Sequence, residues 1–221
     1  NSKDVKFLKK LNFENVSFEY EKNKKIISNL SFEIKKGDII TIKGISGSGK
    51  TTVIDLLSGL ITPTNGKIKI DDKQLAKENI YNWHKKIGYV SQNIFIKEGS
   101  VFENISFNKE ALIKDKSFLE NILKVSCVDE FLNNLKDGIN TNIGERGLLL
   151  SGGQKQRIGI ARALYGSPDL IIFDEATNAI DVEMESKIIN NIKNFYTQST
   201  LILISHRNEI IKYCDNVIDL N

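Results

Sequence analysis

The feature that most constrains this chain is a glycine-rich loop between a short apolar run and a helical pattern. Residues 39–42 (IITI) predict a buried strand, and the loop at residues 44–51 (GISGSGKT) follows it. Apolar residues then recur at helical spacing over residues 53–60. A flexible turn could also join a strand to a helix. The complete order of strand, loop and helix instead favours a loop whose glycines curl the backbone amides around phosphate groups.

This loop predicts a nucleotide site in which backbone N–H groups and the positive end of the following helix hold the phosphates. Lys50 should reach the β- and γ-phosphates, and the hydroxyl of Thr51 should ligate Mg²⁺. The residues expected to contact the nucleotide here are Gly44, Ser46, Gly47, Ser48, Gly49, Lys50, Thr51 and Thr52.

Two adjacent carboxylates follow a second apolar run. Residues 170–173 (LIIF) predict a buried strand, and Asp174 and Glu175 come directly after it. Buried acids are unfavourable unless they are paired or bound to metal. Downstream of a phosphate-binding loop, Asp174 is expected to support Mg²⁺, and Glu175 to orient and polarise the attacking water. The alternative is that Asp174 caps the N-terminus of an ordinary helix.

A third motif lies between the other two, at residues 150–154 (LSGGQ). Ser151 is placed to cap a helix, and Gly152 and Gly153 leave backbone N–H groups exposed at its start. A plain serine cap would explain Ser151 alone, but it would not explain the glycine pair followed by Gln154. Ser151, Gly152, Gly153 and Gln154 therefore form a second expected phosphate-binding site.

Strands alternate with helices along most of the chain, which predicts a mostly parallel sheet covered on both faces. Residues 11–20 and 26–34 instead alternate apolar and polar positions, as an antiparallel hairpin does. From about residue 101 to 166 the pattern is mainly helical. Beyond the strand at residues 170–173, a helix at residues 182–195, a second buried strand at residues 201–205 and a short helix are expected. We therefore expect an α/β core formed by residues 1–100 and 167–221, with an α-helical subdomain inserted at residues 101–166.

Composition and charge exclude several other classes of protein. The net charge is +3, and Lys and Arg are spread along the chain without a basic block, so no nucleic-acid partner is expected. Apolar runs stay far below the roughly 20 residues of a membrane-spanning helix, and no signal peptide is visible. Cys127 and Cys214 have no metal-binding or redox spacing and are expected to be reduced thiols.

The LSGGQ segment resembles the signature motif of ABC-transporter ATPases, and other motifs of that family occur in the expected order along nearly the whole chain. The resemblance implies a P-loop NTPase core of the RecA-like type, with ATP as the nucleotide and Mg²⁺ as the metal. It implies that Tyr20 stacks on adenine and that Gln92 joins Mg²⁺ and water to a transmembrane partner. It also implies that Asp181 ends a loop crossing a dimer interface and contacts the nucleotide there, and that His206 contacts the γ-phosphate.

The same resemblance sorts these residues by role. The implied catalytic residues are Glu175, His206, Lys50 and Gln92, and the implied metal ligands are Thr51, Gln92 and Asp174. Departures from the family pattern are small: Thr51-Thr52 stands where Ser-Thr is usual, Asn178 where Ser is usual and Ile180 where Leu is usual. The site is therefore expected to be competent.

The resemblance also implies partners. Two copies would form a head-to-tail homodimer, with each ATP held between the P-loop of one copy and the LSGGQ of the other. Residues 92–95, 101–105 and 142–147 resemble exporter domains, so the expected function is Mg²⁺-dependent ATP hydrolysis that powers export. The chain opens at Asn1 without a methionine, so it is expected to be a piece of a longer protein. The exporter resemblance implies a transmembrane domain N-terminal to it in the same polypeptide. The ATPase would lie at the cytoplasmic face of the cell (inner) membrane.

Two alternatives stay open: a separate ATPase subunit of an ABC importer, and a soluble, non-transport ABC ATPase. DNA-repair and chromosome-organising relatives carry a long coiled coil between the P-loop and the signature, and no sustained heptads occur here. Translation-associated relatives carry two cassettes in tandem, whereas this chain has one. A non-enzymatic binding module is disfavoured because Lys50, Asp174, Glu175 and His206 are all intact.

Overall fold

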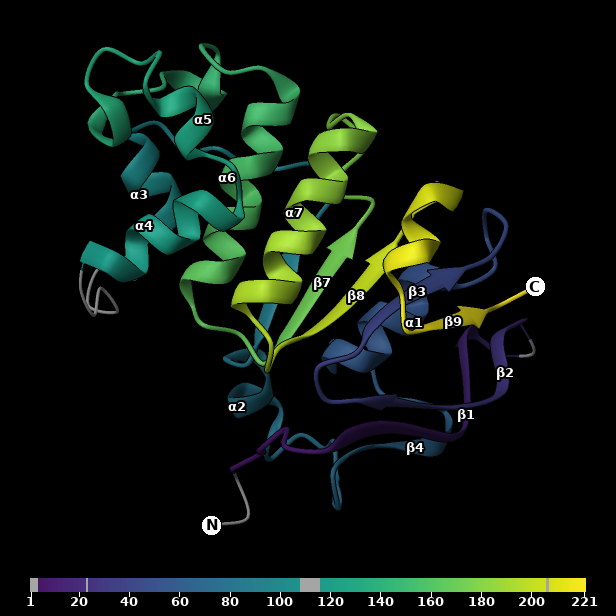
Figure 1. The fold of residues 1–221 in the computed structure, drawn as a ribbon. Coiled ribbons are helices and arrows are strands. Elements are labelled where there is room, and N and C mark those ends of the chain that lie inside the picture. Colours follow the sequence, from purple (N-terminus) through teal and green to yellow (C-terminus); the bar gives the residue numbers. More distant parts are fainter. Residues whose placement is uncertain (1–3, 23, 108–115, 206) are drawn as a thin grey trace. The chain divides into compact units, whose positions relative to one another are not determined.

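The computed structural model describes residues 4–22, 24–107, 116–205 and 207–221. The chain forms two compact units: Asn1–Ile87 together with Gln198–Asn221, and Gly88–Thr197. Helices and strands occur in both units, and both parallel and antiparallel strand pairing is present (Figure 1). The predicted α/β fold is thereby confirmed.

Most of the N-terminal part of the first unit forms an antiparallel sheet. It contains β1 (Lys10–Glu21), β2 (Lys24–Lys35), β4 (Asn65–Ile70) and β5 (Lys73–Gln74), in the order β2-β1-β4-β5. Leu11 of β1 lies opposite Ile34 of β2, and both are buried. Phe13 stacks on its partner Phe32, with ring centroids 4.3 Å apart. The predicted N-terminal hairpin is therefore confirmed.

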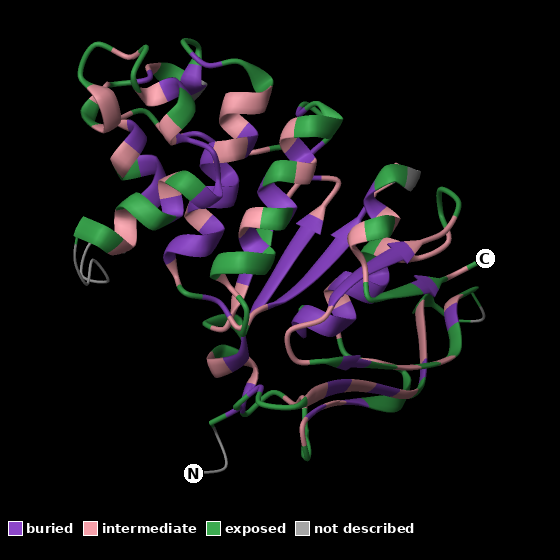
Figure 2. Ribbon diagram, in the orientation of Figure 1, coloured by how far each residue is buried: buried purple, intermediate pink, exposed green. Residues whose placement is uncertain are grey.

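Parallel strands form the other sheet region of this unit. β3 (Ile39–Lys43) lies between β8 (Thr200–Ile204) and β9 (Asn216–Asp219) and pairs with both in parallel. β3 and β8 are buried along almost their whole length (Figure 2), as is typical of apolar runs in a parallel sheet. The glycine loop connects β3 to helix α1 (Lys50–Ser58).

Trp83 joins the short helix α2 (Ile80–His84) to α1. Its side chain is fully buried, its indole N–H donates to the carbonyl oxygen of Leu57 at 2.9 Å, and Phe7 contacts it edge-on. Near the C-terminus, the 3₁₀ helix η4 (Asn208–Tyr213) stands where a short helix was predicted. Helix α1, which follows the glycine loop, is therefore anchored at its C-terminal end.

The second unit combines two neighbouring strands, β6 (Ile87–Val90) and β7 (Leu170–Asp174), with a group of helices. These are α3 (Val101–Ser106), α4 (Lys116–Val125), α5 (Asp129–Leu132), α6 (Gly152–Tyr165) and α7 (Val182–Phe195), with the 3₁₀ turns η2 (Gly138–Asn140) and η3 (Glu145–Gly147). Helix α6 packs against α3 and α4, and α4 also contacts α7. The helices from α3 to α6 match the mainly helical pattern of residues 101–166. Their separation as a subdomain from core residues 1–100 and 167–221 stays a prediction.

The described residues contain no disulfide and no helix that is long and apolar enough to span a membrane. Cys127 is buried and Cys214 is partly exposed, and both are free thiols. The interpretation of the two cysteines as reduced thiols therefore agrees with the structure.

Candidate functional site

The glycine loop of the first unit has the backbone geometry that a phosphate cradle requires. Gly47 and Gly49 have φ values of +83° and +93°, which favour glycine over any residue with a Cβ atom. Gly49 also lies against β2, because a Cβ atom there would come within 2.7 Å of Ile27 Cδ1. Helix α1 begins directly after Gly49, so its first N–H groups and its positive dipole end face the loop.

Lys50 and Ser48 supply side-chain groups suited to phosphate. Lys50 Nζ donates hydrogen bonds to the carbonyl oxygens of Gly44 at 2.8 Å and Ile45 at 3.0 Å, which holds the ammonium across the loop. Ser48 Oγ is buried and has no hydrogen-bond partner among the described residues. A buried hydroxyl without a partner is unfavourable, and a phosphate oxygen would accept its hydrogen. This orphaned hydroxyl therefore fits a loop that is completed by an anionic ligand.

Tyr20 and Thr52 meet beside the loop. Tyr20 Oη and Thr52 Oγ1 lie 3.4 Å apart, which places the end of β1 next to the first turn of α1. The Tyr20 side chain is 60% exposed and contacts Phe18 edge-on, with ring centroids 4.8 Å apart. An exposed aromatic ring held beside a phosphate loop can stack on a base. Stacking of Tyr20 on adenine stays a prediction.

The second unit carries the pair of carboxylates at the end of β7. Asp174 is the last residue of β7, and the next helix, α7, begins only at Val182 and is capped by Asp181. The alternative in which Asp174 caps a helix is therefore wrong. Glu175 has a φ value of +51°, and Asn178 Nδ2 donates to its Oε2 at 3.2 Å. Such a backbone conformation costs about 1 kcal/mol or more for a residue with a Cβ atom and is common at functional sites.

The LSGGQ segment begins helix α6 with a reciprocal cap. Ser151 Oγ accepts from the Gln154 N–H at 3.2 Å, and Gln154 Oε1 accepts from the Ser151 N–H at 2.8 Å. The predicted cap by Ser151 is confirmed, and Gln154 supplies the second half of a capping box. Contacts of Ser151, Gly152, Gly153 and Gln154 with a nucleotide stay predictions.

The segment from Thr177 to Asp181, which we call the crossing loop, is tied to α6 and α7. Gln156 of α6 is buried, and its Oε1 accepts from the Ala179 N–H at 2.9 Å. Thr177 Oγ1 donates to the buried carboxylate of Glu185 in α7. Asp181 Oδ1 accepts from the Met184 N–H at 2.9 Å, and this bond holds the pKa of Asp181 below its usual value. The crossing loop is therefore fixed at its beginning, middle and end.

Helix α6, the crossing loop and the start of α7 line an open pocket of about 320 Å³ in this unit. It is lined by Ser151, Gly152, Gly153, Arg157, Ala179 and Asp181, among others. Gly153 lies so close to the loop that a Cβ atom there would come within 2.9 Å of the Ala179 carbonyl oxygen. Four of the predicted nucleotide-contacting residues thus face one space: Ser151, Gly152, Gly153 and Asp181.

Sequence reasoning missed Gln156 and Glu185, which position the crossing loop. The sequence held a signal for Glu185, because residues 185, 188, 189 and 192 have helical spacing and the last three are apolar. An acid on the apolar face of a helix indicates a buried hydrogen-bond partner. Gln156 carried no such signal, since the partner of its amide oxygen is a backbone N–H group distant in sequence.

The remaining predicted residues are the expected Mg²⁺ ligands and His206, which is expected to contact the γ-phosphate. Gln92 follows β6 and is exposed, and its metal contact stays a prediction, while His206 lies outside the described residues. In the described ranges, no cluster of three or more His, Cys, Asp and Glu residues offers a metal site. The Thr51 hydroxyl of the first unit and the Asp174 carboxylate of the second are each hard oxygen donors. Mg²⁺ typically takes one or two such protein ligands together with substrate phosphates and water, so each of these oxygens suits Mg²⁺. Binding of one ion by both residues stays a prediction.

Known proteins match the chain over nearly its full length. Residues 27–178 match the family described as ABC transporter. The leukotoxin translocation ATP-binding protein of Mannheimia glucosida is 40% identical over 208 residues, covering 93% of the chain and 29% of that relative. A multidrug resistance ABC transporter ATP-binding and permease protein of Lactococcus lactis is 35% identical, covering 95% of the chain and 35% of that relative.

A solved structure supports the same comparison. The structure of a bacterial Atm1-family ABC exporter with ATP bound matches with a TM-score of 0.90 and 32% identity, covering 100% of this chain and 39% of that one. Against all three of these proteins, the chain spans between 29% and 39% of their length. The similarity is therefore to one domain of longer proteins.

Proposed function

Because this chain belongs to the ABC transporter family, we propose that it binds ATP with Mg²⁺ and hydrolyses it to power export by a larger membrane protein. The observation that carries this proposal is the phosphate cradle at residues 44–51. Its glycine backbone, the Lys50 ammonium and the orphaned Ser48 hydroxyl are all suited to an anionic ligand. The neighbouring Tyr20 ring adds a surface for the base.

Binding would exchange weak contacts for stronger ones. Lys50 would turn from two backbone carbonyl oxygens, which carry only partial charges, to the ionised β- and γ-phosphates, where attraction between full charges adds to the hydrogen bonds. The Ser48 hydroxyl would gain an acceptor that it lacks among the described residues. Mg²⁺, when bound by Thr51 and Asp174 with Gln92, would neutralise charge on the β- and γ-phosphates.

Hydrolysis would depend on Glu175. Its carboxylate orients a water molecule and accepts a proton from it while the water oxygen bonds to the γ-phosphorus and the bond to the bridging oxygen of ADP breaks. The hydrogen bond from Asn178 and the strained backbone hold this carboxylate in place. His206 would contact the γ-phosphate.

A second copy of the chain would complete each site. The chain has two helix termini suited to phosphate, one at Lys50 in the first unit and one at Ser151 in the second. A head-to-tail pair would place the Ser151 end of one copy, with its Gly152, Gly153, Gln154 and Asp181, against the ATP held by the other. Loss of the γ-phosphate contacts would then loosen the pair, because a ligand shifts an equilibrium only by its differential affinity.

The membrane part would belong to the same polypeptide. The Lactococcus lactis relative is an ATP-binding and permease protein, and the chain covers 35% of its length. A transmembrane domain N-terminal to the chain would accordingly place the ATPase at the cytoplasmic face of the inner membrane.

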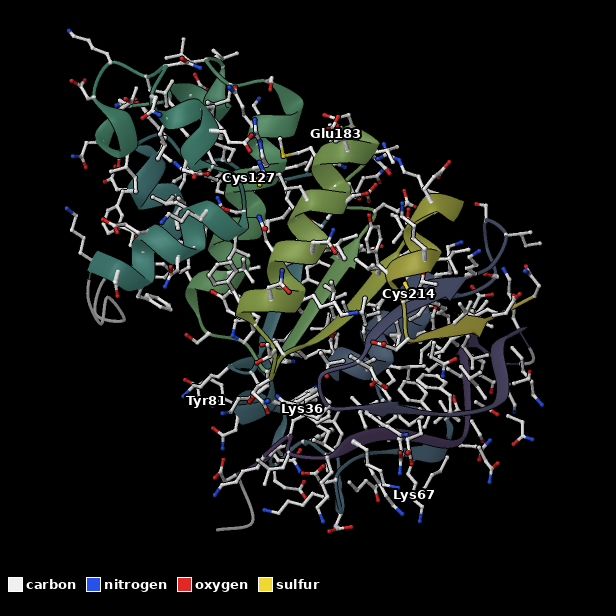
Figure 3. All side chains as sticks on the ribbon, viewed as in Figure 1. Lys36, Lys67, Tyr81, Cys127, Glu183 and Cys214 are labelled. Carbon is white, nitrogen blue, oxygen red and sulfur yellow. The ribbon has the colours of Figure 1, made fainter. Side chains whose placement is uncertain are left out.

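The test separates binding from turnover in the full-length protein. Glu175→Gln should keep ATP affinity within about twofold and reduce the hydrolysis rate by at least about a hundredfold, because general bases contribute roughly 10²- to 10⁴-fold. Glu183→Gln is the matched control, since this exposed acid in the first turn of α7 undergoes the same chemical change (Figure 3). Wild-type turnover in Glu175→Gln would refute the assignment of the general base.

A further inference from the structure

Tyr89 donates a hydrogen bond to the carboxylate that the proposed function assigns to Mg²⁺. Its Oη lies 2.6 Å from Asp174 Oδ2, a distance typical of a hydroxyl bonded to an ionised carboxylate. Tyr89 belongs to β6 and Asp174 ends β7, and these strands are neighbours in the sheet. The phenol hydroxyl and the carboxylate therefore meet across two adjacent strands.

Close packing fixes the strand that carries Tyr89. Gly88 lies against helix α6, because a Cβ atom there would come within 2.7 Å of the Ala163 carbonyl oxygen. Val90 is 1% exposed, whereas the Tyr89 side chain is 46% exposed, as expected where successive side chains of a strand point to opposite faces. The hydroxyl is thus presented by a rigid element, which is the requirement for positioning another side chain accurately.

We infer that Tyr89 is a positioning residue that orients the Asp174 carboxylate for Mg²⁺. Its bond to Oδ2 restrains rotation of the carboxylate and leaves Oδ1 for the metal. Partners of this kind orient metal ligands, and their loss typically lowers metal affinity by about 10- to 100-fold. This inference rests on the proposed function, because it takes Asp174 as the metal-supporting acid.

A hydrogen bond to a carboxylate has two opposite effects on metal binding. It draws electron density from the oxygens, which weakens them as ligands, and it selects one rotamer, which favours binding. Asp174 is only half-buried, so without a partner its carboxylate would sample several rotamers. Orientation is therefore the larger effect here, and removal of the hydroxyl weakens Mg²⁺ binding.

The test is Tyr89→Phe, which removes the hydroxyl and keeps the ring, in the full-length protein with Glu175→Gln to suppress turnover. Binding of a fluorescent ATP analogue is titrated with Mg²⁺ and measured separately in EDTA. Tyr81→Phe is the matched control, because it makes the same change at an exposed tyrosine of α2 (Figure 3). The Tyr81 ring contacts Lys85, whose Nζ lies 4.3 Å from the ring centroid. The Mg²⁺ midpoint should rise about tenfold in Tyr89→Phe, equivalent to about 1.4 kcal/mol. Affinity in EDTA and the Tyr81→Phe midpoint should not change.

Two different results would overturn the inference. A Mg²⁺ midpoint in Tyr89→Phe within about twofold of the parent, with Asp174→Asn strongly impaired, would refute the role of Tyr89 alone. If nucleotide binding does not depend on Mg²⁺ in the parent protein or in any variant, Asp174→Asn included, the proposed metal site is contradicted, and this inference with it. Misfolding of a variant would lower its affinity in EDTA as well, so the comparison of the two titrations separates it from a metal defect.

Discussion

Lys50 is the residue on which nucleotide affinity should depend most. Its ammonium donates to two carbonyl oxygens of its own loop and is thereby held where phosphate groups would lie. Hydrogen bonds to charged groups contribute about 1.5–3 kcal/mol, so Lys50→Ala should weaken ATP binding by about 10- to 100-fold. Titration with a fluorescent ATP analogue measures this. Lys77→Ala, an exposed lysine outside the loop, should bind normally, and unchanged affinity in Lys50→Ala would contradict the phosphate cradle.

The two cysteines make a prediction about thiol reactivity. Burial raises the pKa of both Cys127 and Cys214 to about 11 from a usual value of 9.0. At about pH 8 the reactive thiolate is then about a hundredfold scarcer than in the unfolded chain, so alkylation by iodoacetamide should be slower by at least that factor. Cys214 should react before Cys127, because it is partly exposed. Rapid alkylation of native Cys127 would contradict its buried position.

At the scale of elements, the crossing loop is the part whose position depends on side chains outside it. Gln156→Ala would leave the Ala179 N–H without its acceptor, which should lower the free energy of unfolding by about 1–3 kcal/mol. ATP turnover should fall as well, whereas the affinity for ATP, set by the first unit, should not. Thermal unfolding and hydrolysis assays test this. Gln198→Ala, at an exposed position, is the control. Equal stability of the two variants would show that the hydrogen bond between Gln156 and Ala179 is unimportant.

The strands and helices that could be predicted are those whose own residues show a clear apolar pattern. The expected strand at residues 39–42 is β3 (Ile39–Lys43), the strand at 170–173 is β7 (Leu170–Asp174), and the helix at 182–195 is α7 (Val182–Phe195). Strand β9 was not predicted, because only two of its four residues are apolar and it forms by parallel pairing with β3. The pairings of Tyr89 with Asp174 and of Gln156 with Ala179 were missed for the same reason, since each joins residues far apart in sequence.

At the scale of the whole molecule, the proposed head-to-tail pairing makes a single copy incomplete, because its two helix termini suited to phosphate would serve two different ATP molecules. Ser151→Arg should preserve ATP binding by the first unit, because the Ser151 cap belongs to α6 of the second unit. The same substitution should abolish turnover, since an arginine would fill the space proposed for the ATP of the partner copy. Equilibrium binding and steady-state hydrolysis distinguish the two effects. Full turnover in Ser151→Arg would argue that the site is complete within one copy.

The most direct test of the account is the rate of Mg²⁺-dependent ATP hydrolysis per molecule, measured against concentration of the ATPase chain for wild type and Glu175→Gln side by side. A composite site, formed by residues of two copies, predicts a rate per molecule that rises with concentration in the wild type, because association of the copies assembles the site. Glu175→Gln should show almost no hydrolysis at any concentration. A rate per molecule that is independent of concentration and equal in both proteins would contradict both the composite site and the role of Glu175.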